Sequence, residues 1–342
     1  MAKRGNNQRG KAPRKSRPEP NSANHQNPEP STSQNLTTQT TSPDANFARG
    51  IQIAQILFFC LTQFVTPAIQ KFLCRMKLPS PRVRDFDHVK LLKKMFYHQK
   101  KKSQCFSERL SNTLIRNAIA ARNDICHIDL KFLTTNWKRH ALVWISLCRC
   151  VGNARAAFRV RVIYNLLTRG KYKHVVRSHA FRLNTGNYNQ HTAFGLSFIL
   201  YGCLTKYIAP ALRTFMINTK SRPLSTTYDV FKNLKYLIAE QEVDIDYLAT
   251  GGNTRNDSAL LKLCMKARHM TCHGFNSRIF NQWKSYLQSW IQLMDVIKAN
   301  DTSAELQDIL DYLVNHKQRG LKIRSASILF WLSSFPNTTP NL

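Results

Sequence analysis

The stretch Ile56–Phe72 reads ILFFCLTQFVTPAIQKF, and a similar stretch, ILYGCLTKYIAPALRTF, returns as Ile199–Phe215 at an offset of 143 residues. A Cys-Leu-Thr triplet, a Pro-Ala pair and a final Phe recur in register. Both copies are long apolar segments that lack the alternation of polar and apolar residues typical of a strand. The recurrence predicts one helical unit used twice.

Further matches extend the repetition along the chain. They keep the same order at offsets of 142 to 146 residues: FDHVKLLK from Phe86 with YDVFKNLK from Tyr228, NTLIRNAIAAR up to Arg122 with SALLKLCMKAR up to Arg268, and Trp137, Lys138 and Trp144 with Trp283, Lys284 and Trp290. Chance similarity between helices does not preserve order and spacing together. We infer a tandem duplication that covers residues 49–168 and 190–316.

The predicted fold class is all-α, with two tandem bundles of four to five helices that pack on each other as an intramolecular pseudo-dimer. Trp137 and Trp144 are seven residues apart on one helix face, so we expect them to anchor the core. Pro67 lacks a backbone donor, and we expect Thr62 and Thr66 to stabilise a kink there.

The remaining segments flank and connect the repeats. Residues 1–48 hold six of the 13 prolines and few large apolar residues, which predicts a disordered tail. The tail begins with basic residues that favour nuclear import or nucleic-acid binding, namely Lys3, Arg4, Arg9, Lys11, Arg14, Lys15 and Arg17. Residues 169–189 form a basic linker, and residues 317–342 a C-terminal helix, over Ser327–Phe335, and tail.

The first helix of each repeat is apolar enough to suggest a membrane span. Ile56–Ile69 is only 14 residues long, however, whereas a span needs about 20. Lys206 also interrupts the second copy. We therefore expect two buried bundle helices and no membrane.

The charge balance points to a polyanionic partner. The 342 residues carry a net charge of +32, which excludes a typical neutral metabolic enzyme. Between Lys131 and Tyr228 there are 16 Lys or Arg and no Asp or Glu, while 11 of the 19 acids lie from Asp229 onward. RNA contacts are predicted for basic residues near the middle of the chain: Lys100, Lys101, Lys102, Arg159, Arg161, Arg169, Lys171 and Lys173.

Nine cysteines, with no CxxC pair and no apolar leader after the first Met, indicate an intracellular protein with reduced thiols. The adjacent pairs Cys126-His127 and Cys272-His273 lack the spacing of structural zinc sites, so no metal is expected. We interpret Cys126 and Cys272 as packed apolar residues rather than nucleophiles.

Each repeat carries one polar cluster at the same place. The first reads Arg122-Asn123-Asp124-Ile125-Cys126-His127, and the second reads Arg268-His269-Met270-Thr271-Cys272-His273. Positions five apart on a helix differ by about 140°. We therefore expect each Arg at the end of one helix and each His in or just past a turn, or else an Arg side chain that reaches round the helix.

This pattern, an Arg followed by a polar residue, three others and a His near the start of the last long helix, resembles the signature of HEPN domains (higher eukaryote and prokaryote nucleotide-binding). The W-x6-W helix that follows is similar to that of a eukaryotic branch, which includes the HEPN domain of a DAZ-interacting zinc-finger ubiquitin ligase and related animal proteins. The resemblance covers both repeats, about 250 residues.

The resemblance implies a ribonuclease that needs no metal or other cofactor. Its composite catalytic site would consist of Arg122, His127, Arg268 and His273, supported by Asn123 and His269. A His can deprotonate the ribose 2′-OH, and an Arg can stabilise the charged phosphate. The expected products carry 2′,3′-cyclic phosphate and 5′-OH ends.

Two other functions remain open at this point. HEPN bundles also serve as RNA-binding scaffolds that do not cleave, and as adaptors that bind proteins. An Arg-His pair at a bundle interface can simply satisfy buried polar groups. The sequence contains no phosphate-binding loop motif, no zinc-protease motif and no serine-hydrolase motif that would suggest another enzyme class.

Overall fold

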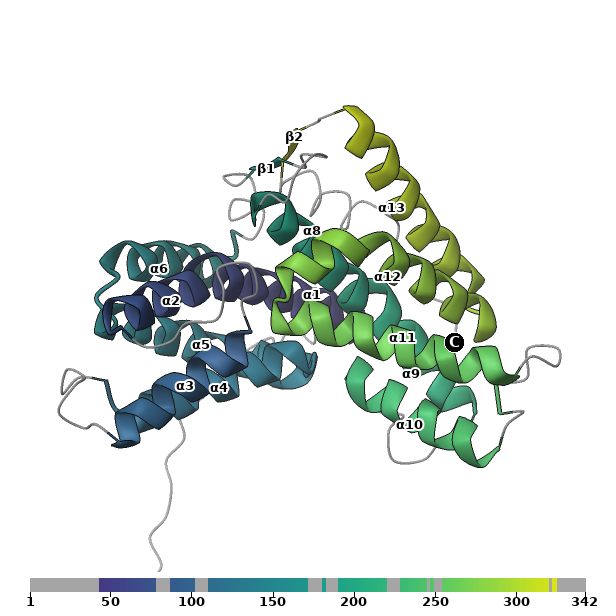
Figure 1. Cartoon of the computed structure of the whole chain (residues 1–342), viewed down its shortest axis with the longest axis horizontal. Coiled ribbons are helices and arrows are strands. Elements are labelled where there is room, and N and C mark those ends of the chain that lie inside the picture. The colour runs from purple at the N-terminus through teal and green to yellow at the C-terminus, as the bar shows by residue number, and fades with distance from the viewer. Residues whose placement is uncertain are drawn as a thin grey trace, which may run out of the picture. The chain divides into compact units, whose positions relative to one another are not determined.

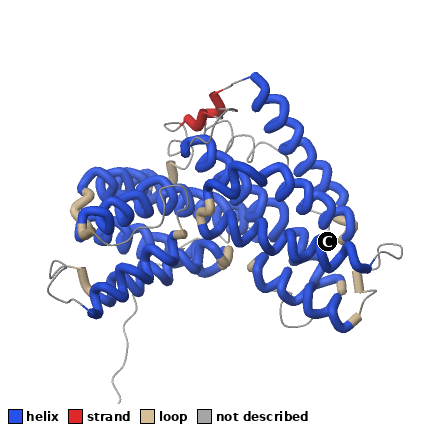
Figure 2. The backbone as a smooth tube through the Cα atoms, in the orientation of Figure 1, coloured by secondary structure: helices blue, strands red, loops and turns tan. Residues whose placement is uncertain are grey.

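A computed structural model of the chain describes residues 43–77, 87–101, 110–171, 180–182, 190–219, 228–244, 247–248, 254–319 and 322–324. These residues are almost entirely helical, which confirms the all-α prediction (Figure 2). Residues 1–42 of the predicted basic tail lie outside the described residues. Most of the linker and the C-terminal segment Ser327–Phe335 lie outside them too.

In the described residues, the first repeat consists of five helical segments (Figure 1). They are the continuous run α1 (Pro43–Cys60), η1 (Leu61–Val65) and α2 (Thr66–Arg75), followed by α3 (His88–Lys101), α4 (Asn112–Cys126), α5 (Leu130–Cys150) and α6 (Ala154–Thr168). The helix thus begins at Pro43, five residues before the predicted end of the tail, and a proline is well suited to a first helical position.

The second repeat uses the same plan. Its segments are the continuous run α8 (Gln190–Cys203), η2 (Leu204–Ile208) and α9 (Ala209–Asn218), then α10 (Val230–Val243), α11 (Thr254–His273), α12 (Asn276–Val296) and α13 (Asn300–Arg319). A short antiparallel ribbon joins β1 (Ala180–Arg182), from the segment between the repeats, to β2 (Lys322–Arg324), which follows α13.

An irregular turn marks the same point in both first helices. η1 and η2 are π-helical turns, and each precedes a proline, Pro67 or Pro210, that cannot donate a helical hydrogen bond. The Thr62 hydroxyl donates to Phe58 O at 3.0 Å, and the Thr66 hydroxyl donates to Leu61 O at 2.8 Å. Both threonines beside Pro67 thus bond to the backbone of their own helix around the irregular turn.

The continuous first helices are longer than their apolar segments suggested. Phe47–Arg75 and Thr192–Asn218 are each long and apolar enough to cross a membrane, so the length argument made from Ile56–Ile69 does not hold. Core helices of soluble proteins pass the same test, and 83% of each apolar stretch is buried within the protein. Their burial agrees with the expected bundle helices.

One hydrophobic core runs through both repeats. Trp144 and Trp290 are fully buried, and Trp137 and Trp283 nearly so, which confirms these residues as core anchors. The repeats meet along α1 and α8, where the rings of Phe58 and Tyr201 stack with centroids 3.9 Å apart. The tandem bundles therefore form a single packed assembly within one chain.

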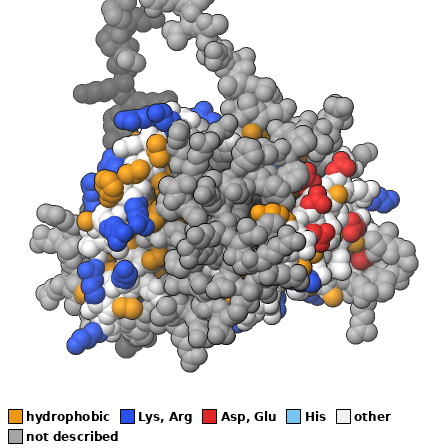
Figure 3. Space-filling view, turned by 90° about the horizontal axis from the view of Figure 1, so that it is seen from above, with side chains coloured by type: hydrophobic (Ala, Val, Ile, Leu, Met, Phe, Trp, Pro, Cys, Tyr) orange, Lys and Arg blue, Asp and Glu red, His pale blue; other side chains and the backbone are white. Residues whose placement is uncertain are grey.

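Charge is unevenly distributed on the face of the protein shown in Figure 3. Figure 3 shows Lys and Arg side chains gathered over the first repeat and Asp and Glu side chains over the second. The exposed face of α6 carries Arg155 and Arg159, whereas that of α13 carries Asp301, Asp308 and Asp311.

Candidate site at the seam between the repeats

The two polar clusters end equivalent helices. Arg122 lies in the last turns of α4, and His127 follows as its C-cap residue. Arg268 lies in α11, whose last residue is His273, and Gly274 turns the chain with φ +72°. His127 lies in the turn after α4, as expected, whereas His273 is still part of α11 and the turn follows at Gly274.

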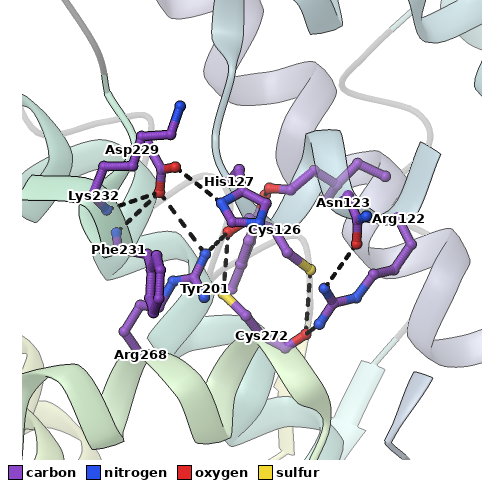
Figure 4. A network of polar contacts seen from close by, with 11 residues as sticks. Arg122, Asn123, Cys126, His127, Tyr201, Asp229, Phe231, Lys232, Arg268 and Cys272 are labelled. Carbon is purple, nitrogen blue, oxygen red and sulfur yellow. Dashed lines mark hydrogen bonds and ion pairs between the residues drawn. The ribbon is translucent and has the colours of Figure 1, made fainter. Parts of the chain in front are cut away.

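The two arginines hold the clusters together across the repeats (Figure 4). Nη2 of Arg122 donates to Cys272 O at 2.8 Å, and Nη2 of Arg268 donates to Cys126 O. Both residues are only 3% exposed. We call this contact between the ends of α4 and α11 the seam. Its reciprocal bonds satisfy carbonyls at each helix end that have no partner within the helix.

Neither guanidinium faces solvent, which differs from the direct phosphate contact that the sequence suggested. Nε of Arg122 and Nε of Arg268 are buried and have no hydrogen-bond acceptor among the described residues. Each arginine thus keeps one unused donor. Both also bring a positive charge into the seam.

Each histidine pairs with an aspartate of the other repeat. Nδ1 of His127 lies 2.9 Å from Oδ2 of Asp229, and Nδ1 of His273 lies 3.5 Å from Oδ1 of Asp87. The His127 side chain is 41% exposed and that of His273 is 19% exposed. At His127, an Nδ1–H that donates to Asp229 leaves Nε2 as the proton acceptor.

Asp87 and Asp229 were not among the residues predicted for the site. They occupy matching positions in FDHVKLLK and YDVFKNLK, and each accepts backbone N–H bonds at the start of a helix, α3 or α10. Their recurrence in both copies of an otherwise basic stretch was the available signal.

The environment of Asp87 strongly favours its ionised form. Burial opposes ionisation, but the hydrogen bond with His273, the N–H of Lys90 and the positive charges of both residues outweigh it, so the pKa falls to about 2. Asp229 also lies 3.9 Å from Nη2 of Arg268, which links the aspartate, the arginine and His127 in one cluster.

The supporting residues differ between the copies. Asn123 Oδ1 accepts a 3.2 Å hydrogen bond from Nη1 of Arg122, as a residue that orients the arginine should. His269 instead stacks on His273, with ring centroids 4.0 Å apart. Burial first, and then the charges of His273 and the arginines, lower the pKa of His269 to about 4. Burial likewise lowers the pKa of His273.

The predicted RNA contacts lie away from the seam. Arg159 and Arg161 are on α6, with Arg169 and Lys171 just past its end, and none of the four has a described contact with either cluster. Lys100 and Lys101 end α3, while Lys102 and Lys173 lie outside the described residues.

In the part of the chain that the structure describes, no group of three or more His, Cys, Asp or Glu side chains is arranged to bind a metal ion. Comparison with protein-family models, curated proteins and solved structures gave no match to this chain.

Proposed function

We propose that this protein is a metal-independent endoribonuclease of the HEPN type. The observation that carries the proposal is the meeting of the two clusters, 146 residues apart, with each His paired to an Asp of the other repeat. Neither repeat alone contains a complete set of these groups. The duplication therefore supplies, at the seam, the Arg, His and Asp side chains that neither repeat provides in full.

RNA supplies its own nucleophile, so two proton transfers are sufficient for cleavage. His273, whose lowered pKa keeps the imidazole neutral at pH 7, is suited to take the proton from the 2′-OH. His127, paired with Asp229, would return a proton to the departing 5′ oxygen. The 2′ oxygen would attack phosphorus and close the cyclic phosphate.

The arginines would act through their fixed charges. A phosphate passing into a pentacovalent state gains negative charge, and two buried cations beside the histidines stabilise it without needing to reorganise. The basic α5 and α6 surface, with no acid from Lys131 onward in the first repeat, would draw the RNA to this side of the protein.

The test is cleavage of an end-labelled single-stranded RNA in EDTA, followed by analysis of the product ends. We expect cyclic-phosphate products from the wild type and a loss of ~10²-fold or more from His127→Ala with His273→Ala, as the removal of proton transfer costs. His98→Ala, on α3 and away from the seam, is the matched control. Cleavage that survives the double substitution in folded protein would overturn the proposal.

A non-cleaving RNA-binding scaffold is the second candidate, and the burial of Arg122 and Arg268 favours it. Arginines that donate to carbonyls serve to fasten the repeats together. On this view, folded wild type would leave several RNAs intact but bind them with an affinity that falls steeply with salt.

A further inference from the structure

Cys126 and Cys272 each stand immediately before a motif histidine and meet at the centre of the seam. Both are fully buried. Sγ of Cys126 lies 3.2 Å from Cys272 O, and Sγ of Cys272 lies 3.7 Å from Cys126 O. Figure 4 shows the two sulfurs between the guanidinium groups. The thiols therefore form a reciprocal pair contributed by both repeats.

The electrostatics of this pair differ from those of the other buried cysteines. Burial raises the pKa of Cys126, but the contact with Cys272 and the charges of Arg122 and Arg268 outweigh it and lower the pKa overall. The contact with Cys126, together with burial, raises the pKa of Cys272. The two arginines thus favour the thiolate form at Cys126 rather than at Cys272.

Four other buried cysteines in the described part of the chain have no arginine among the groups that shift their pKa, although Lys206 acts on Cys203. Burial raises the pKa of every one of them: Cys60, Cys148, Cys203 and Cys264. Since the thiolate is the form that reacts with oxidants, these four are the natural internal controls for the seam pair.

We propose that Cys126 and Cys272 are an oxidation site at which the two repeats become joined by a disulfide. The oxidant class is a small neutral peroxide, which can enter when the seam opens locally. The inference does not depend on RNA cleavage, because it uses only the thiol pair and its two arginines.

The chemistry is balanced with hydrogen peroxide. The Cys126 thiolate attacks one peroxide oxygen, the O–O bond breaks, and a sulfenic acid forms with release of hydroxide. The Cys272 sulfur then attacks the sulfenic sulfur, the S–O bond breaks, and the disulfide forms as water leaves. The Cys272 proton leaves in that water, and the hydroxide from the first step takes up the proton that Cys126 released to solvent when it ionised. Two thiols are oxidised and one peroxide is reduced to two waters.

The sequence makes the product easy to identify. Trypsin cuts after Arg122 and Arg268 themselves and releases peptides 123–131 and 269–278, each with a single cysteine. The folded full-length chain would be treated with increasing peroxide, blocked with an alkylating agent, digested without reductant and analysed by mass spectrometry.

We expect the linked pair of these peptides at lower peroxide than any oxidation of the four control cysteines, and its disappearance on dithiothreitol treatment. Cys272→Ser should abolish the link, and Cys60→Ser should leave it unchanged. If Cys272→Ser fails to fold, the presence or absence of the linked peptides 123–131 and 269–278 in the wild-type protein still tests the proposal. Oxidation of the exposed Cys74 while Cys126 and Cys272 remain unlinked in folded protein would overturn the proposal.

Discussion

The outermost helix of the first repeat, α6, presents Arg155, Phe158, Arg159 and Val162 along one exposed face. At the corresponding place in the second repeat, α13 presents Asp301, Asp308 and Asp311. Both helices pack on the tryptophan helix of their own repeat, α5 or α12. The comparison teaches that the duplicated unit kept its buried side while its two outer surfaces took opposite charges.

The seam shows a second, finer difference. His127 is the more exposed histidine and has the shorter contact to its aspartate, whereas His273 is more buried and stacks on His269. The repeats therefore supply one open and one enclosed imidazole. Such a division suits a pair that takes and returns a proton in turn.

Turn residues have also diverged. The position after the first motif is Ile128 with φ 55°, and its match in the second repeat is Gly274 with φ 72°. At the later turn the order is reversed, with Gly152 at φ 70° and Lys298 at φ 58°. The left-handed backbone is retained at both turns even where a side chain makes it costly.

The largest effect is expected from the shared buried positions. Trp144→Ala and Trp290→Ala should each lower the free energy of unfolding by about 3–5 kcal/mol, because each leaves a large cavity at a fully buried site. Chemical denaturation measures this. Phe158→Ala, at an exposed site, should change stability by no more than about 0.5 kcal/mol. A large difference between the tryptophans would show that only one repeat depends on this anchor.

Acid stability tests the environment of Asp87. Since the pKa of Asp87 is lowered to about 2, its contribution is fully present above about pH 4 and is lost as the pH falls through about 2. Asp87→Asn keeps a helix cap but should cost about 2 kcal/mol at pH 7 and flatten this part of the profile. Urea denaturation from pH 2 to 7 tests it. Asp311→Asn is the exposed control, and parallel profiles for wild type and Asp87→Asn would contradict it.

The opposite surfaces should differ in RNA binding, if the proposed function holds. Arg155→Glu with Arg159→Glu should weaken affinity and reduce the salt slope by about 2, because each arginine contributes about one phosphate contact. Fluorescence anisotropy over a salt series measures both. Asp308→Lys with Asp311→Lys, the reverse change on α13, should not weaken binding. Equal effects from both pairs would mean that overall charge, not α6, controls affinity.

The smallest change makes the second motif more like the first. With its pKa lowered to about 4, His269 takes up a proton less readily in the folded than in the unfolded state, so the fold loses stability as the pH falls from about 6.5 towards 4. His269→Asn, which copies Asn123, should remove that part of the acid sensitivity. Imidazole titration by NMR and denaturation at pH 4 and 7 would check it. An unperturbed His269 titration near pH 6.5 would refute the prediction.

Much of the fold could be predicted because the two repeats of the chain could be aligned with each other. The aligned blocks located the helices, the proline irregularity and the tryptophan anchors. They could not show that η1 and η2 join neighbouring helices without a break, since a π turn has no distinct composition. The start of α1 at Pro43 was missed because polar residues there resemble the tail.

The site could be predicted only in outline. Duplication indicated that two Arg-His clusters would meet, and the structure brings them together. The acceptors of the arginines are backbone carbonyls, however. Every residue has one, so the sequence does not indicate which carbonyl will lie next to a guanidinium. Asp87 and Asp229 were present in the aligned blocks but looked like ordinary helix caps until the interface brought them to the histidines.

The reciprocal arginine bonds also have a consequence for how the protein is made. The acceptor of Arg122, Cys272 O, lies 150 residues further along the chain, and the acceptor of Arg268, Cys126 O, lies 142 residues earlier. At a synthesis rate of about 5–20 residues per second, the first bundle leaves the ribosome roughly 7–30 s before its acceptor exists. During that interval its charged helix end has only water for a partner. The seam can therefore form only after the second repeat has been synthesised, so its formation distinguishes the full-length chain from an incomplete one.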